Sequence, residues 1–191
     1  FFIEWLVKIN QLIPAPAGLQ AMQKQAAELT EALMNFKDIG HFVIVAIVVA
    51  VIPAIGEEFL FRGLLLGDML KAKVRPQVAI PVTGLLFALV HGEFHNTLAI
   101  WVLGSFLGYL YYASGSLWLP ILAHFTNNFL AVLLKYLFNT GVISKDLAEA
   151  ETPLYATVIS VVVFAGLLFI LTKWKKPANF VEPEPEIEVP I

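Results

Sequence analysis

The sequence predicts an all-α protein: a polytopic helical membrane protein with about five transmembrane helices and an N-terminal amphipathic helix. Of its 191 residues, 59% are hydrophobic and only 14% are charged, whereas a soluble domain has about 25% charged residues. The apolar residues also gather in long uncharged runs, and a helix needs ~20 such residues to cross a bilayer. Composition and patterning together therefore indicate an integral membrane protein.

Composition also excludes several classes of function. The net charge of -3 is small, and no cluster of basic residues indicates a nucleic-acid partner. The chain contains no cysteine, which excludes disulfides, catalysis by a thiolate and metal sites built from cysteine. Composition therefore predicts the lipid bilayer as a partner and gives no indication of a nucleic acid.

Five hydrophobic segments account for the predicted spans. From the N-terminus they are residues 41–69, residues 76–92, two segments within 98–134 joined by a turn at 113–116, and residues 152–172. The last segment holds 21 uncharged residues and is the clearest spanning helix. Before them, residues 17–36 place apolar side chains on one helical face, which predicts an amphipathic surface helix.

The chain divides into four regions. They are residues 1–38 with a partial N-terminal helix and the amphipathic helix, residues 39–138 with the core helices, residues 139–176 with a loop and the final transmembrane helix, and residues 177–191 with an acidic Pro/Glu tail. A tail of this composition buries too little apolar surface to fold, so it is expected to be disordered.

The first hydrophobic segment carries three ionisable side chains within six residues: Glu57, Glu58 and Arg62. They follow an uncharged run, 42–56, whose 15 residues are too few to span a bilayer. A charge near the bilayer centre costs ~2.5–3.5 kcal/mol or more, so charges kept there indicate a functional site. Glu58 and Arg62 are four residues apart and predict an ion pair. Glu57 points about 100° away and stays available for chemistry.

Polar residues on two further segments lie at a similar depth. Glu57 lies ~20 Å from the end of its helix, and His91 lies ~22 Å along the second segment. Asn128 lies ~16 Å along the fourth segment, with His124 one turn lower on the same face. Three helices therefore present polar groups at one level, which predicts a single shared site.

These residue types suit hydrolysis within a membrane. Glu57 and His91 could hold and deprotonate a water molecule, while His124 and Asn128 could donate hydrogen bonds to the oxyanion of a tetrahedral intermediate. Alternatively, Glu57, His91 and His124 could bind a divalent metal, zinc, which would activate the water. The residues themselves do not choose between these two mechanisms.

Three motifs in fixed order carry a resemblance to a known family. The motifs are Glu57-Glu58-x-x-x-Arg62-Gly63, Phe87-x-x-x-His91 and His124-x-x-x-Asn128. They resemble those of the CPBP family, which comprises CAAX-type prenyl-protein endopeptidases and bacteriocin-processing or self-immunity membrane proteases. The resemblance covers about residues 44–133.

The resemblance implies an all-helical membrane endopeptidase, located in a bacterial-type inner (plasma) membrane. It implies that Glu57 and His91 activate the water, that His124 and Asn128 form the oxyanion site, and that the other two charged residues of the first motif support the first helix. It does not imply a prenylated substrate, since many members act without one.

Two other functions are compatible with the same residues. A non-catalytic immunity or scaffold protein would use the polar cluster to bind a partner, and a proton-coupled transporter would use Glu57, Glu58 and the histidines as a relay. Two structural expectations complete the analysis. Gly104-x-x-x-Gly108 predicts a close approach of two helices, and Asn96 is expected to cap the third segment.

Overall fold

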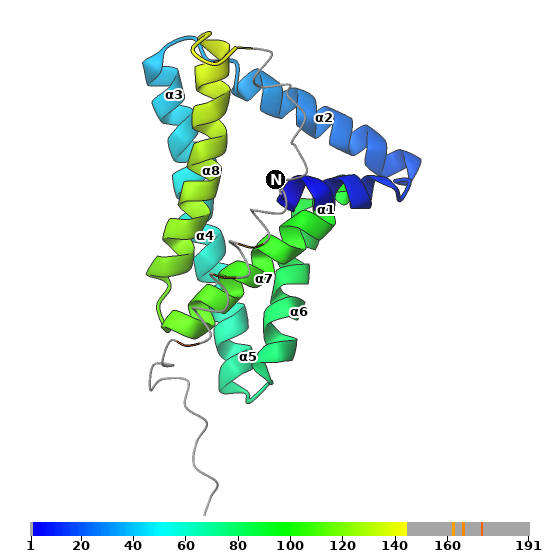
Figure 1. Ribbon diagram of the computed structural model, residues 1–191, viewed down its shortest axis with the longest axis vertical. Helices are drawn as coiled ribbons and strands as arrows, with labels where there is room; N and C mark the ends of the chain where they lie inside the picture. Colours follow the sequence, from blue (N-terminus) through cyan, green and yellow to red (C-terminus); the bar gives the residue numbers. More distant parts are fainter. Residues whose placement is uncertain (1, 145–161, 163–165, 167–172, 174–191) are drawn as a thin grey trace, which may run out of the picture.

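The computed structural model describes residues 2–144 together with residues 162, 166 and 173, and within 2–144 it contains helices and no strands. The elements are α1 (Phe2–Gln11), α2 (Ala17–Leu33), α3 (Ile39–Ala46), η1 (Ile47–Val51), α4 (Ile52–Glu58), η2 (Phe59–Leu66), α5 (Gly67–Lys71), α6 (Pro76–His91), η3 (Phe94–Asn96), α7 (Thr97–Ser114) and α8 (Trp118–Asn139). The all-α prediction is confirmed (Figure 1).

The elements from α3 to α5 join end to end into one helix of 33 residues, Ile39–Lys71. Asp38 begins it by accepting a hydrogen bond from the His41 backbone N–H at 2.8 Å, as an N-cap does. Two stretches of this helix, η1 and η2, have the wider π-helical turn. Such turns are rare and are frequent at functional sites. Here they flank α4, which ends at the two adjacent glutamates.

Three helices in the described part of the chain are long and apolar enough to cross a membrane: Ile39–Lys71, Phe94–Ser114 and Trp118–Asn139. The second predicted segment forms α6, a shorter apolar helix of 16 residues. The turn predicted at 113–116 is present, where Gly115 ends α7 with a left-handed backbone conformation. The fifth predicted segment, 152–172, and the tail, 177–191, lie outside the described residues.

The long helix Ile39–Lys71 joins two groups of helices (Figure 1). Its N-terminal half packs along α8, where Phe42, Val45 and Val132 form a buried cluster. Its C-terminal part packs on α6, where Leu66 and Ile80 belong to a second cluster. Helix α4 lies between these two clusters. Residues of the α6–α7 pair and of α8 can therefore meet around it.

Helices α6 and α7 approach closely because glycine lies at their contact. A Cβ atom added at Gly84 would lie 2.5 Å from Ser105 Oγ and 2.7 Å from the Ser105 backbone N. One added at Gly104 would lie 3.0 Å from the Phe87 ring. The close approach predicted at Gly104 is confirmed, and it brings the face of α6 that carries Phe87 against α7.

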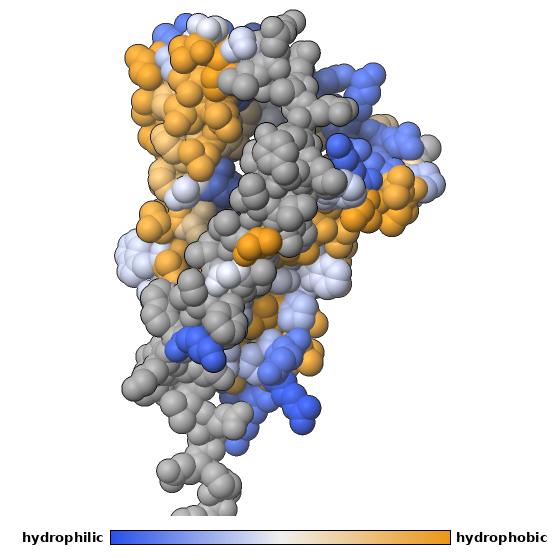
Figure 2. All heavy atoms as spheres, viewed as in Figure 1, coloured by the Kyte–Doolittle hydropathy of each residue, from blue (hydrophilic) through white to orange (hydrophobic). Residues whose placement is uncertain are grey.

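The outer surface of the bundle is apolar, as a surface facing lipid requires. Figure 2 shows hydrophobic side chains over the upper part of α3 and α8. The exposed large hydrophobic residues there are Val43, Ile44, Ile47, Val48, Leu130 and Leu134. The predicted amphipathic helix is present as α2, and its apolar residues Met22 and Leu29 are exposed.

The glycine contact between α6 and α7 gives a testable expectation. Replacing Gly84 by alanine places a methyl group against the Ser105 backbone, so Gly84→Ala should lower the free energy of unfolding by about 1–3 kcal/mol. Gly18→Ala is the matched control, since a Cβ on this helical glycine meets nothing within 4 Å. Thermal unfolding in detergent measures both, and an unchanged midpoint for Gly84→Ala would contradict the contact.

Candidate active site

A buried ion pair forms the base of the candidate site. Glu58 is the last residue of α4, and Arg62 lies one turn later in η2. Arg62 Nη1 donates to Glu58 Oε1 at 2.7 Å, and the two side chains are 1% and 0% exposed. A buried charge is stable only when it is paired and hydrogen-bonded. The ion pair predicted from the four-residue spacing is confirmed.

Arg62 also connects the first helix to the α6–α7 hairpin. Its Nη2 donates to the Gly104 carbonyl oxygen of α7 at 2.7 Å, and its guanidinium carbon lies 4.6 Å from the centroid of the Phe87 ring of α6. A guanidinium placed over an aromatic face is stabilised by the negative potential of the ring. Arg62 therefore holds three helices in register at the level of the glutamates.

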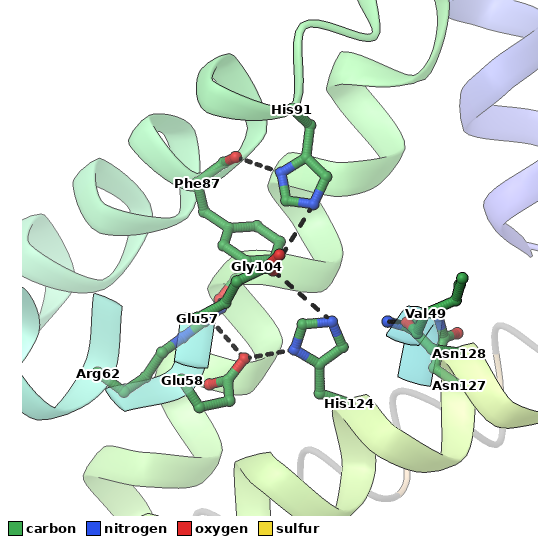
Figure 3. A network of polar contacts seen from close by, with 10 residues as sticks. All are labelled: Val49, Glu57, Glu58, Arg62, Phe87, His91, Gly104, His124, Asn127 and Asn128. Carbon is green, nitrogen blue, oxygen red and sulfur yellow. Dashed lines mark hydrogen bonds and ion pairs between the residues drawn. The ribbon is translucent and has the colours of Figure 1, made fainter. Parts of the chain in front are cut away.

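His124 of α8 binds the same carboxylate oxygen. Its Nδ1 lies 2.8 Å from Glu58 Oε1, and its side chain is 5% exposed. The same Glu58 oxygen accepts from Arg62, so His124 Nδ1–H is the donor. Nε2, the other nitrogen of this ring, therefore points away from Glu58 and toward Glu57 (Figure 3).

His91, the last residue of α6, is held in a similar way. Its Nδ1 lies 2.7 Å from the Phe87 backbone carbonyl oxygen. A carbonyl oxygen only accepts, so the His91 Nδ1–H donates, and Nε2 of a neutral ring carries the free lone pair. The Phe87 and His91 rings lie 4.4 Å apart, centroid to centroid. This packing directs His91 Nε2 toward Glu57.

The two imidazoles converge on one carboxylate oxygen. Glu57 Oε2 lies 3.8 Å from His91 Nε2 and 3.9 Å from His124 Nε2 (Figure 3). It is buried and has no hydrogen-bond partner among the described residues. Both distances are too long for a direct hydrogen bond. Two atoms 3.8 Å apart are, however, both within ~2.8 Å of one suitably placed oxygen, so the three groups can share a single water or substrate oxygen.

The three groups lie slightly farther apart than the ligands of a bound zinc ion do. Tetrahedral zinc with bonds of ~2.1 Å places its ligand atoms ~3.4 Å apart, whereas Glu57 Oε2 is 3.8 and 3.9 Å from the two nitrogens. Among the described residues, no group of three or more His, Cys, Asp or Glu side chains is arranged to hold a metal ion. We therefore derive no catalytic step through a metal.

Asn128 lies one turn beyond His124, outside this network. Its Nδ2 donates to the Val49 carbonyl oxygen of η1 at 3.2 Å, and its Oδ1 accepts from Asn127 at 3.2 Å. Pro53 has no N–H to donate to the Val49 carbonyl, four residues earlier, and the Asn128 amide donates to this carbonyl. Figure 3 shows Asn128 beside Val49. The second N–H of this amide is not used in these bonds, and its role toward an oxyanion stays a prediction.

Sequence reasoning missed the contacts of Asn10, and it assigned a capping hydrogen bond to Asn96 that Asn96 does not make. Asn96, expected to cap α7, bonds through its amide to Glu93 Oε2 at 2.5 Å. The N–H of Leu98, in the first turn of α7, is instead capped by Asn10 of α1 at 3.1 Å. Nothing in the local sequence around Asn10 indicates this contact, because its partners lie more than 80 residues away.

Comparison with known families supports the resemblance seen in the motifs. Residues 39–130 match the model of a family described as type II CAAX prenyl endopeptidase, Rce1-like. The match covers just under half of the chain. No curated protein and no solved structure matches the chain.

The Rce1-like region contains every residue of the network around Glu57, since it runs from the start of α3 to Leu130 of α8. With three helices able to span a bilayer, the chain is an integral membrane protein, and its residues 39–130 are similar to a CAAX-type protease family. A peptide or protein is the class of substrate that such a family implies.

Removing Arg62 should destabilise the whole bundle. Arg62→Met leaves the Glu58 carboxylate buried without its cation, which should cost about 3–5 kcal/mol of unfolding free energy. Lys71→Met is the matched control, because the Lys71–Asp68 pair is exposed and such pairs contribute little. Thermal unfolding in detergent measures both variants. Equal midpoints for Arg62→Met and wild type would show that the pair does not support the fold.

Proposed function

We propose that the chain is an intramembrane endopeptidase that hydrolyses a peptide bond with a water molecule activated by Glu57 and His91. One observation carries this proposal: a buried carboxylate oxygen without a hydrogen-bond partner among the described residues faces the Nε2 atoms of two histidines from two other helices. Glu57 Oε2 and His91 Nε2 both accept hydrogen bonds, which suits a molecule that can donate two of them, and water is the smallest such molecule.

The two ring nitrogens of His91 define its part in this reaction. Since Nδ1–H is committed to the Phe87 carbonyl, Nε2 is free to accept a proton. A water between His91 and Glu57 donates one hydrogen bond to each. As its oxygen attacks the peptide carbonyl, one of the two groups takes a proton. That proton passes to the nitrogen of the leaving amine when the carbon–nitrogen bond breaks.

His124 suits the opposite task, which is to donate a hydrogen bond to the developing oxyanion. Its Nδ1–H is committed to Glu58, so Nε2 donates this bond in the doubly protonated form of the ring.

The substrate is proposed to be a membrane-associated peptide or protein. The side chains of Glu57 and His91 are 33% and 29% exposed, whereas His124 lies deeper. A peptide carbonyl can therefore reach the water from the Glu57–His91 side and place its oxygen toward His124. The name of the matched family makes a prenylated CAAX peptide the first candidate. Unprenylated peptides, as bacteriocin-type processing requires, are the second.

The proposal predicts loss of cleavage when either activating group is removed. Glu57→Gln and His91→Ala should each lower kcat by about 10²–10⁴-fold, the usual contribution of general acid–base catalysis. Their thermal midpoints should stay near wild type, because neither residue belongs to the Glu58–Arg62 ion pair. Purified protein is assayed on fluorogenic peptides, prenylated and plain.

Glu28→Gln is the matched control, since it makes the same exchange at an exposed acid of α2, away from this network. Full activity of Glu57→Gln or His91→Ala would refute the assignment. Binding of a peptide without cleavage by wild type or variant would instead support the non-catalytic immunity or scaffold function. Loss of cleavage on adding a chelator would bring back the metal mechanism.

A further inference from the structure

The side chain of Asn10 ties the N-terminal helix to the turn that follows His91. Asn10 is 8% exposed. Its Nδ2 donates to the Phe94 carbonyl oxygen in η3 at 2.6 Å, and its Oδ1 accepts from the Leu98 backbone N–H in α7 at 3.1 Å. One buried amide thus binds two backbone groups of the α6–α7 connection. Helix α1 lies outside residues 39–130, the part of the chain that matches the family.

Helix α7 needs a partner at this position. The first N–H groups of a helix have no acceptor within the helix, and a side chain at the N-cap usually accepts one of them. The side-chain oxygen of the N-cap residue Asn96 accepts no such bond, and its Nδ2 donates to Glu93. Asn10 replaces it as a cap supplied from another helix. Without Asn10, the partly buried Leu98 N–H would lose its acceptor, which is costly.

The clamped turn begins at His91. Helix α6 ends at His91, and Gly92 reverses the chain with a left-handed φ of +67°. Phe94 and Leu98, the two residues that Asn10 holds, follow within seven positions. Helix α1 packs against both η3 and the start of α7 (Figure 1). A helix end frays unless the chain beyond it is fixed, so the position of the His91 ring depends on this turn.

We propose that Asn10 is a positioning residue for His91. By fixing η3 and the first turn of α7, Asn10 keeps the last turn of α6 in place and holds His91 Nε2 within reach of the oxygen that it shares with Glu57. This inference rests on the proposed function. It makes α1, a helix outside the family-matched region, part of the working enzyme.

Two variants of Asn10 separate its two hydrogen bonds. Asn10→Leu keeps a similar volume and removes both. Asn10→Asp keeps the acceptor for the Leu98 N–H and removes the donor to the Phe94 carbonyl. Gln11→Leu is the matched control, because it removes an amide from the neighbouring, exposed position of the same helix. If Asn10→Leu fails to fold, Asn10→Asp carries the test.

The expected result is a loss in kcat with little change in KM. A displacement of ~1 Å at a catalytic group can cost about 10²-fold, so Asn10→Leu should lower kcat by between about tenfold and a hundredfold. Asn10→Asp should fall between Asn10→Leu and wild type, and Gln11→Leu should match wild type. A purely structural role predicts the same kcat for the folded fraction of every variant.

Hydrogen exchange, followed by mass spectrometry, tests the clamp without relying on activity. In Asn10→Leu, backbone amides of residues 92–98 should exchange faster, while those of α8 should be unchanged. Faster exchange with unchanged kcat would overturn the positioning role, and unchanged exchange would overturn the clamp itself. If wild type cleaves no peptide, the proposed function fails separately, and exchange alone decides whether Asn10 holds the turn.

Discussion

The candidate site depends on one carboxylate oxygen, Glu58 Oε1, which is buried between a guanidinium and an imidazole. It accepts from Arg62 at 2.7 Å and from His124 at 2.8 Å. Through Arg62 it reaches the Gly104 carbonyl oxygen of α7, and through His124 it fixes α8. A buried charge tolerates only arrangements in which it remains paired, so Glu58 determines how these helices meet. The same bonds orient His124 Nε2 toward Glu57, which links the stability of the bundle to the chemistry of the site.

The backbone around this carboxylate departs from regular helix where the site requires it. Two π-helical stretches, η1 and η2, flank α4, and the Asn128 side chain donates to the Val49 carbonyl, for which Pro53 has no N–H. On the opposite side, the contact of Gly84 with α7 brings the Phe87 ring under Arg62. Most polar groups of the site therefore have a hydrogen-bond partner, as the interior of a bilayer requires.

Much of this arrangement could be predicted from the sequence, because it follows from spacing along single helices. The four-residue step from Glu58 to Arg62 predicts their pair, and the similar depth of Glu57, His91 and His124 predicts their meeting. Contacts between distant segments could not be predicted in this way. Asn10 meets Phe94 across 84 positions, and no local pattern encodes that distance. The assignment of Asn96 as a cap failed for a related reason: a backbone N–H of α7 bonds instead to Asn10, more than 80 positions away.

A double-mutant cycle between Glu58 and His124 tests the central claim most directly. The unfolding free energy in detergent is measured for wild type, Glu58→Gln, His124→Gln and the double variant. If Glu58 organises the site through His124, the two single effects should not add, and the coupling energy should be at least about 1 kcal/mol, within the range found for residues in one hydrogen-bonded network. Additivity within about 0.3–0.5 kcal/mol, as for independent sites, would contradict the account.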